Sequence, residues 1–358
     1  MKKLFLFALF AALCCSCTES GTDENTDPNG GSNSGQTTPP DPDSDAKDVI
    51  HVPKGGMLAG ILNELGLKSP SSLKLSGTLG VSDFTTLRNI QSLEHLDISR
   101  VNLSVLPTEA FLECTNIKSV ILPNTLTAIG TQAFWGSSLV SISIPASVEE
   151  IRGSAFFGCS SLKTVTFEKG SKLKTVAGFS HCTSLTTIEI PASVETIGQY
   201  AFNDCTSLHT VTFEKGSKLK TIGSDVFLNC TSLTMIEIPA SVETIEDQAF
   251  EGCSLLATVT FEKGSQLKTV DGFSNCTALT TVDMSACTQV TRIEYRAFYE
   301  DSKLQLFKIG TRTPPSCGRN VFTGINSYSV LKVPAGCVDA YKNATGWKEF
   351  TTISELDE

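Results

Sequence analysis

The sequence predicts a repeat solenoid of the α/β type, in which short parallel strands stack into one long sheet. Two observations lead to this prediction. The segment Ile-Pro-Ala-Ser-Val-Glu begins at Ile144, Ile190 and Ile238, and the segment Phe-Glu-Lys-Gly-Ser begins at Phe167, Phe213 and Phe261. Both segments recur at intervals of 46 and 48 residues, and each falls midway between copies of the other. Units of about 23 to 25 residues that cannot bury their apolar face alone stack into an elongated core.

A finer pattern runs through the same region, with an apolar residue, two variable positions, and then apolar residues that alternate with polar ones. Its starts are 22 to 25 residues apart, at Leu93, Ile117, Leu139, Leu162, Leu185, Leu208, Leu233, Leu256, Leu279 and Leu304. Alternation with a period of two predicts one short strand per coil, with apolar side chains inward and polar ones toward solvent. We therefore expect about eleven coils and a concave parallel sheet.

Two further residue types recur on the return path of each coil. We expect a buried spine of rings from Phe111, Phe134, Phe156, Phe179, Phe202, Phe227, Phe250, Phe273 and Phe298. A second position is held by Cys114, Cys159, Cys182, Cys205, Cys230, Cys253 and Cys276, with Ser137 between the first two. One cysteine per coil predicts a ladder of free buried thiols, because parallel Cβ vectors fit disulfide geometry poorly. The pairing of Cys287, Cys317 and Cys337 stays open.

Residues 1–17 have the form of a lipoprotein signal peptide. Lys2 and Lys3 precede an apolar run from Leu4 to Leu13, which is too short to span a bilayer. The next residues, Cys-Cys-Ser-Cys, resemble a bacterial lipobox and make Cys17 the expected lipidated residue. Lipidation of Cys15 and ordinary signal-peptidase cleavage are the alternatives. Several acyl chains on Cys17 would anchor the protein to a membrane.

Residues 18–48 are expected to be a disordered acidic tether, because they contain almost no apolar side chains. This segment carries −7 of the formal net charge of −10. Its first acids resemble the signal that sends some Gram-negative lipoproteins to the outer leaflet. We therefore expect an outer-membrane protein displayed on the cell surface, with a periplasmic orientation as the alternative. The acidic balance disfavours binding to nucleic acid or to an anionic membrane surface.

The two ends of the repeat region are expected to be caps. In residues 49–90, the cap and first coil, apolar residues from Met57 to Leu65 form one helical stripe that Gly66 ends, and Leu73 to Leu75 is the expected first strand. Residues 91–312 form the solenoid. Residues 313–358 form the last coil and cap, with a final strand at 330–333 and a buried Trp347. A partner-binding role for the helix or for Trp347 is the alternative.

The segment from Ile190 to Leu208 has the pattern Ile-Pro-x-Ser-Val-x-x-Ile-x-x-x-Ala-Phe-x-x-Cys-x-Ser-Leu. It resembles the BspA-like leucine-rich repeat family of bacterial surface lipoproteins, and the resemblance covers about residues 90 to 310. It implies a leucine-rich repeat fold and a role in adhesion to host matrix proteins or to other cells. Unlike the more familiar leucine-rich pattern, this one places Pro145, Pro191 and Pro239 directly after the strand. Proline has no N–H group, so it must lie where the strand stops pairing.

The outward positions of the strands are the candidate binding residues. Hydroxyl groups dominate them, acids occur in every second coil, and aromatic rings, which usually stack on sugars, are absent. The acids Glu189, Glu237 and Asp283 suit a basic patch on a protein partner, although any solvated parallel sheet also favours threonine. The candidate residues are Thr164, Thr166, Thr187, Glu189, Thr210, Thr212, Met235, Glu237, Thr258, Thr260, Thr281 and Asp283.

No motif predicts catalysis, a cofactor or a metal site. His181 adjoins Cys182, but the repeat turns that thiol inward, and the chain after Cys17 contains no Cys-x-x-Cys pair. We therefore expect a binding protein that recognises a protein or another macromolecule, such as a host matrix protein. A scaffold role in an outer-membrane assembly and an accessory role in glycan capture are the alternatives.

Overall fold

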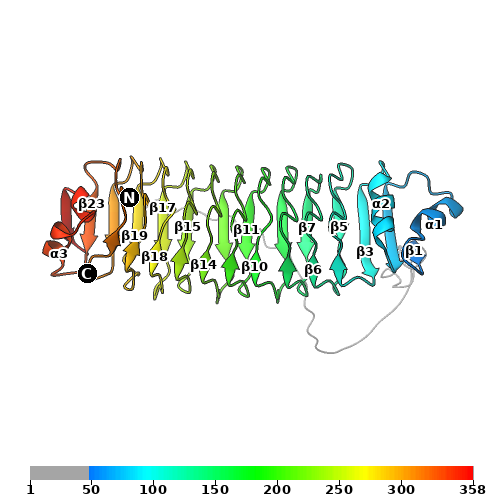
Figure 1. Ribbon diagram of the computed structural model, residues 1–358, viewed down its shortest axis with the longest axis horizontal. Helices are drawn as coiled ribbons and strands as arrows, with labels where there is room; N and C mark the ends of the chain where they lie inside the picture. Colours follow the sequence, from blue (N-terminus) through cyan, green and yellow to red (C-terminus); the bar gives the residue numbers. More distant parts are fainter. Residues whose placement is uncertain (1–47, 358) are drawn as a thin grey trace, which may run out of the picture. The chain divides into compact units, whose positions relative to one another are not determined.

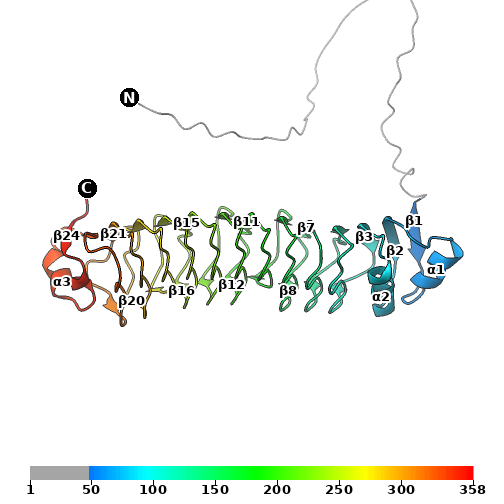
Figure 2. The same cartoon turned by 90° about the horizontal axis from the view of Figure 1, so that it is seen from above.

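The computed structural model describes residues 48–357 of the 358-residue chain. Residues Ala46–Glu358 belong to one compact unit, whose described part is an elongated stack of coils (Figure 1). A view turned by 90° shows that the stack is nearly straight (Figure 2). Cys17, the predicted signal peptide and residues 18–47 of the predicted tether lie outside the described residues.

One side of the stack is a row of parallel strands, one from each coil. An eight-stranded sheet is followed by a six-stranded sheet that continues the row (Figure 1). The solvent-facing side of this row is called the strand face below. Its strands are β1 (Val49–Val52), β2 (Ser72–Gly77), β3 (His95–Val101), β5 (Ser119–Ile121), β7 (Ser141–Ile144), β9 (Thr164–Phe167), β11 (Thr187–Ile190), β13 (Thr210–Phe213), β15 (Met235–Ile238), β17 (Thr258–Phe261), β19 (Thr281–Met284), β21 (Leu306–Ile309), β23 (Val330–Val333) and β24 (Thr352–Glu355).

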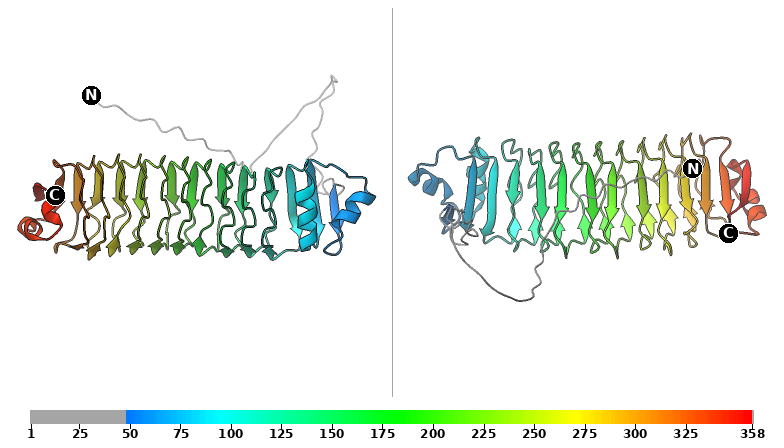
Figure 3. Two further views of the ribbon diagram at one scale, coloured as in Figure 1. Left: turned by 45° about the horizontal axis from the view of Figure 1, so that its top comes forward. Right: turned by 180° about the vertical axis from the view of Figure 1, so that it is seen from behind.

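A second parallel sheet of ten short strands runs along another side of the stack, as the views in Figure 3 show. The sequence does not predict this sheet, because strands of two residues carry no periodic signal. Each of them begins as the chain turns back from the strand face. They are β4 (Val105–Leu106), β6 (Ala128–Ile129), β8 (Glu150–Ile151), β10 (Thr175–Val176), β12 (Thr196–Ile197), β14 (Thr221–Ile222), β16 (Thr244–Ile245), β18 (Thr269–Val270), β20 (Arg292–Ile293) and β22 (Ser316–Cys317).

The helices of the described chain lie toward the two ends of the stack, so the repeat itself consists of strands and turns (Figure 1). This refines the α/β-type coil that the sequence predicts. Helix α1 (Leu58–Glu64) matches the predicted stripe and buries Leu58 and Leu62. Helix α2 (Val81–Asn89) precedes β3. At the other end, α3 (Val338–Asn343) and the 3₁₀ helix η2 (Trp347–Glu349) bury Tyr341 and Trp347.

The predicted number of about eleven coils is too low, because the stack has about 13 turns. The difference lies at the ends. The first strand is β1 rather than the predicted Leu73–Leu75 segment, which lies in β2 and pairs with β1 in register. At the other end, β24 follows the predicted final strand and pairs with it over four residues. Each cap therefore adds a strand that the repeat pattern does not contain.

The predicted phenylalanine spine is confirmed. Rings of successive coils stack nearly parallel from Phe111 to Phe298, with centroids 4.7 to 5.7 Å apart. Phe84 of α2 closes one end of the spine edge-on, and Phe322 continues the other end. These rings are almost completely buried. Because each ring stacks on the rings of the neighbouring coils, the spine ties adjacent coils together.

The predicted cysteine ladder is also confirmed, and its thiols are free and buried. From Cys159 to Cys276, each Sγ donates to the backbone carbonyl of the spine phenylalanine in the preceding coil, at 2.9 to 3.3 Å. Ser137 takes the same place and lies 3.4 Å from the Sγ of Cys159. Burial raises the pKa of Cys205 and of Cys253 to about 12. Burial therefore disfavours the thiolate form of these two cysteines, which act as packed hydrogen-bond donors. Cys287, Cys317 and Cys337 are free as well.

Candidate functional site: the strand face

Parallel pairing places all twelve predicted binding residues on the strand face, in two columns. In the first column, Thr187 pairs with both Thr164 and Thr210, and Thr258 pairs with both Met235 and Thr281. In the second column, Glu189 pairs with Thr212, and Thr260 lies between Glu237 and Asp283. Thr166 belongs to the second column but has no partner on β11. The residues from Thr164 to Glu237 are exposed, whereas those on β17 and β19 are half-buried.

The strand face is interrupted at regular positions. Strands β11 and β13 pair over four residues, as do β7 with β9 and β15 with β17. In contrast, β9 and β11 share only the pair Thr164 and Thr187, and β5 and β7 share only Ser119 and Ser141. Between β13 and β15 the sheet ends and a new one begins. From β5 to β17 the strand face is therefore built from pairs of coils with a seam between one pair and the next, whereas β17 and β19 pair over three residues.

A proline follows the later strand at each of these seams, but prolines at the same position, Pro123 and Pro334, also follow strands that pair with the preceding strand over three residues. After the strands β9, β13 and β17, the backbone N–H groups of Glu168, Glu214 and Glu262 donate to the last carbonyl of the preceding strand, at 2.9 to 3.0 Å. The equivalent residues after β7, β11 and β15 are Pro145, Pro191 and Pro239, which have no N–H to donate. The carbonyl of Phe167 therefore receives no such bond from position 191. At the seams between β5 and β15 the missing bond coincides with the loss of strand pairing.

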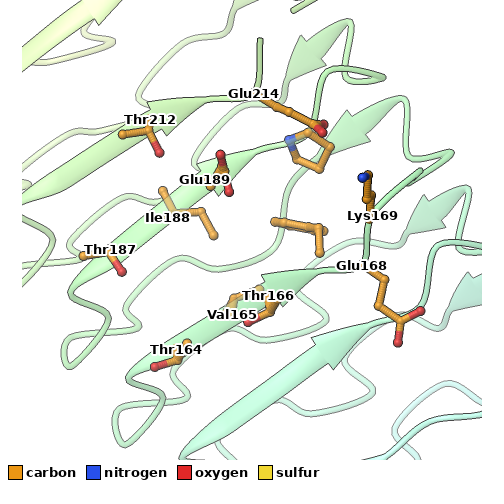
Figure 4. Close-up of a pocket in the computed structure, with 12 residues that line it drawn as sticks. Thr164, Val165, Thr166, Glu168, Lys169, Thr187, Ile188, Glu189, Thr212 and Glu214 are labelled. Atoms are coloured by element: carbon orange, nitrogen blue, oxygen red, sulfur yellow. The ribbon is translucent and has the colours of Figure 1, made fainter. Parts of the chain in front are cut away.

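A groove of about 350 Å³ lies at the seam between β9 and β11. Figure 4 shows Thr164, Thr187 and Thr212 projecting from successive strands, with Glu189 among them. Pro191 and the turn residues Glu168, Lys169 and Glu214 also line the groove. A smaller groove of about 190 Å³ lies at the seam between β5 and β7. Both grooves expose hydroxyl groups and carboxylates beside backbone segments that do not pair with the neighbouring strand.

The turn glutamates have a structural role as well. The carboxylate of Glu214 accepts the N–H of Ala192 at 2.9 Å, and that of Glu262 accepts the N–H of Ala240 at the same distance. Glu168 accepts the N–H of Ala146 at 3.2 Å. Each bond joins the two turns within one pair of coils. The binding residues predicted from the sequence do not include these glutamates. The alternation of Glu-Lys-Gly turns with Pro-Ala-Ser turns is the sequence feature that could have revealed them.

The three predicted acids of the strand face differ in their surroundings. Glu189 and Glu237 are exposed and form no ion pair within residues 48–357. Asp283 lies 2.9 Å from Nζ of Lys308. Burial raises the pKa of Asp283, but hydrogen bonds from Ser285 and Lys308 outweigh burial, so the net effect lowers it. Glu189 and Glu237 are therefore the two unpaired negative charges among the three.

The residues considered for catalysis, His181 and Cys182, do not belong to the strand face. Within the described residues, no group of three or more His, Cys, Asp or Glu side chains has the arrangement of a metal site. The thiol of Cys182 donates to a buried carbonyl, while Nε2 of His181 lies 3.7 Å from the carboxylate of Asp204. Burial raises the pKa of Cys182 well above its usual range. Between residues 48 and 357, no helix is both long and apolar enough to cross a membrane.

The family model described as "BspA type Leucine rich repeat region (6 copies)" matches residues 82–178, 175–305 and 269–353. No curated protein matches the chain.

Several solved structures are similar to this chain. A leucine-rich repeat protein from Bacteroides ovatus is 23% identical over 80% of this chain and 82% of its own, with a TM-score of 0.48. The pneumococcal vaccine antigen PcpA is 19% identical over 81% of this chain and 80% of its own, with a TM-score of 0.41. A leucine-rich repeat protein from T. pallidum is 26% identical over 59% of this chain and 86% of its own, with a TM-score of 0.42.

Proposed function

The chain belongs to the BspA-type leucine-rich repeat family, and on this premise we propose that it is a lipid-anchored, surface-displayed binding protein. Its partner is a protein or another macromolecule, such as a host matrix protein, and its binding surface is the strand face. Solenoids of this kind offer long surfaces on a rigid core, which suits recognition of an extended partner.

The observation that carries this proposal is the groove at the seam between β9 and β11. It combines exposed hydroxyl groups, the unpaired carboxylate of Glu189 and backbone that is free of ladder bonds. Backbone groups that have left a ladder are ready partners for another chain's donors and acceptors. Glu237 lies two coils from Glu189, about 10 Å along the stack. A partner with basic side chains at a similar spacing would meet both carboxylates.

The test is a binding experiment with residues 46–358, which contain the whole described core. The immobilised fragment is exposed to matrix proteins, outer-membrane extract and glycan arrays. Capture of a matrix protein supports the proposal, and loss of that capture in the double variant Glu189→Lys, Glu237→Lys assigns it to the strand face. The matched control is Glu64→Lys, Glu113→Lys, which makes the same charge change at exposed positions away from the strand face. Binding only to a membrane complex supports the scaffold alternative, and binding only to glycans supports glycan capture.

The anchor rests on sequence alone and needs its own test. Metabolic labelling with a palmitate analogue is expected to label the wild-type protein and not the Cys17→Ser variant. Labelling of Cys17→Ser that disappears in Cys15→Ser would move the lipid to the alternative cysteine. Protease treatment of intact cells then distinguishes the two orientations, since a surface-displayed protein is degraded and a periplasmic one survives.

A further inference from the structure

Two coils of the solenoid have a shortened turn after the second sheet. In most coils, six positions separate the first residue of this strand from the spine phenylalanine, as between Thr221 and Phe227. Only four positions separate Thr269 from Phe273, and the same shortening occurs between Thr175 and Phe179. The chain thus loses two residues from a turn that all neighbouring coils keep. The longer turns on both sides project beyond the short one and leave a recess.

Glycine makes the short turn possible at Gly272. Its φ of +85° lies in the left-handed region, and a Cβ there would lie 2.3 Å from the backbone nitrogen of Ala249. The short turn therefore packs directly against the preceding coil. The recess above it has a volume of about 170 Å³. Its walls come from Asp247, Gln248 and Glu251 on one side and Tyr295, Arg296 and Tyr299 on the other, and its floor comes from Asp271, Gly272, Ser274 and Asn275.

The recess holds three carboxylates and one guanidinium group. Asp271 is the floor residue, with an exposed fraction of only 9%. Its Oδ1 accepts the N–H of Gly272 at 2.6 Å, and its Oδ2 has no hydrogen-bond partner within residues 48–357. Arg296 does not neutralise the acids by an ion pair in the described chain. Its guanidinium carbon lies over the rings of Tyr295 and Tyr299 instead, 5.0 and 4.6 Å from their centroids.

The electrostatics of the recess follow from this arrangement. Burial raises the pKa of Asp271 to about 7, and the carboxylates of Asp247, Glu294 and Glu251 add to the shift, while the Gly272 N–H opposes it. Burial and the neighbouring acids Asp225 and Glu251 also raise the pKa of Asp247. Carboxylates that lie close together in a partly desolvated site stay charged only at a cost. A bound cation would relieve this cost.

The other short turn provides an internal comparison. Ala177 stands there at the position of Asp271, and Gly178 stands at the position of Gly272. The flanking turns carry Ser154 and Phe157 in place of Gln248 and Glu251. The same shortening therefore occurs without the acids, which shows that folding of the short turn does not require Asp271.

We propose that the recess over Asp271 binds a single basic side chain, an ammonium or guanidinium group, of a partner protein. The excess of carboxylates over guanidinium selects for a cation, and a recess of this volume admits the end of a side chain. The described residues offer no group suited to a metal ion here, which favours an organic cation. This proposal does not depend on the strand face, since the recess lies in the turns beyond the second sheet.

The test uses the fragment 46–358 labelled with 3-fluorotyrosine, because the chain has five tyrosines and two of them line the recess. The ¹⁹F signals are assigned by single Tyr→Phe variants. The fragment is then titrated at pH 8 with N-acetyl-lysine amide, N-acetyl-arginine amide and the uncharged N-acetyl-norleucine amide. We expect saturable shifts of the Tyr295 and Tyr299 signals with one or both cationic probes. The signal of Tyr200, beside the other short turn, should not move.

Asp271→Ala is the matched variant, since it copies Ala177. It should not lower the unfolding midpoint, because it removes a carboxylate that is charged at a cost, and it should weaken cation binding by about ten-fold. Binding should also weaken between pH 8 and pH 5.5, as Asp271 takes up a proton. The proposal is overturned if the norleucine probe shifts the same signals equally, if neither cationic probe shifts them, or if Asp271→Ala binds as well as the wild type. The variant Glu189→Lys, Glu237→Lys should bind the probes normally, so failure of the strand-face proposal can be recognised separately.

Discussion

Oδ1 of Asp301 accepts the backbone N–H of Cys276 at 2.9 Å, and by this bond a carboxyl group takes the next place in the cysteine ladder. Asp301 follows its spine phenylalanine, Phe298, by three positions, as Cys276 follows Phe273. The side chain is fully buried, and its Oδ2 has no hydrogen-bond partner within the described chain. Burial raises the pKa of Asp301 well above its usual range, although the bond from Cys276 opposes this. The ladder therefore ends in a buried carboxyl group whose charged form the fold disfavours.

We predict that Asp301→Asn stabilises the protein at neutral pH. Below the pKa of the unfolded state, near 3.9, both states carry the proton and Asp301 makes no pH-dependent contribution. Above it, the unfolded state releases the proton while the folded state retains it, so the free energy of unfolding falls as pH rises toward the folded pKa. Asparagine cannot ionise and so removes this loss, which is a gain of about 1.4 kcal/mol for each pH unit above the unfolded pKa, up to the folded pKa, while its Nδ2 group takes the unpartnered place of Oδ2.

Denaturant unfolding at pH 4 and pH 7 measures this effect. The gain should be much smaller at pH 4 than at pH 7. Asp301→Cys restores the ladder residue and should also be more stable than the wild type at pH 7. If both variants lose stability at both pH values, the buried carboxyl group is making a favourable interaction and the prediction is wrong.

The phenylalanine spine gives a second prediction. Phe202 lies in the middle of the spine with no exposed surface, between Phe179 and Phe227 at centroid distances of 5.7 and 5.5 Å. Phe202→Ala should lower the free energy of unfolding by about 3–5 kcal/mol, because it leaves a cavity that rigid neighbouring coils cannot close. Tyr200→Ala is the control, since Tyr200 is half-exposed and should lose under about 1 kcal/mol. A loss for Phe202→Ala no larger than that of the control would contradict the packing of the spine.

Much of this core can be predicted from the sequence because every coil of a solenoid buries equivalent residues in the same way. Once the strands alternate with a period of two, the inward direction of Val165 and the outward direction of Thr166 are fixed for each coil. The equal spacing of Phe202 and Cys205 then places one ring and one thiol per coil inside. The ends of the stack do not repeat, so strands β1 and β24 lack the pattern that reveals the others.

The features of the candidate sites follow from differences between coils rather than from their shared pattern. The seam at Pro191 lies where one N–H group is missing, and the alternation of the two turns reveals that position. The recess at Asp271 depends on two missing residues, visible when Thr269–Phe273 is aligned with Thr221–Phe227. The alignment does not show which side chains pair across coils. Asp283 forms an ion pair with Lys308, whereas Glu189 forms none within the described chain.

A third prediction concerns a column of alternating charges along the edge of the second sheet. Glu243 lies between Lys220 and Lys268, at N–O distances of 2.9 and 2.6 Å. Hydrogen bonds and charge from both lysines lower the pKa of Glu243 to about 2. A lowered folded pKa gives stability that is present above the unfolded pKa, near 4.3, and is lost as pH falls toward 2. Glu243→Gln should therefore lower the unfolding midpoint at pH 7.

The size of this effect should depend on salt and on the number of lysines. Because the carboxylate is exposed, the decrease should be small and should shrink further in about 1 M salt. Glu195 pairs with one lysine, Lys174, at 2.8 Å, so Glu195→Gln should cause a smaller decrease. Thermal unfolding followed by circular dichroism measures both variants. Equal decreases for the two, unchanged by salt, would mean that packing rather than charge explains them.

The last prediction tests whether a proline creates the seam. In Pro191→Ala the new N–H group faces the carbonyl of Phe167, in the same relation as the N–H of Glu214 to the carbonyl of Ile190, which are 2.9 Å apart. If the bond forms, β9 and β11 gain ladder pairing and the groove between them narrows. Stability should change by under about 1 kcal/mol, because the new bond offsets the greater freedom of the unfolded chain without proline. Partner binding through the groove should weaken.

Hydrogen exchange is the direct measurement, since the new amide at position 191 is expected to exchange as slowly as that of Glu214. The reverse change at Glu214 provides the comparison. Glu214→Pro removes the equivalent bond and should open a seam between β11 and β13, seen as faster exchange at Val211 and Thr212. Glu214→Ala keeps the N–H and should leave that exchange slow, which separates the backbone bond from the carboxylate. Fast exchange of the new amide in Pro191→Ala would mean that side-chain packing, and not the missing N–H group, holds β9 and β11 apart.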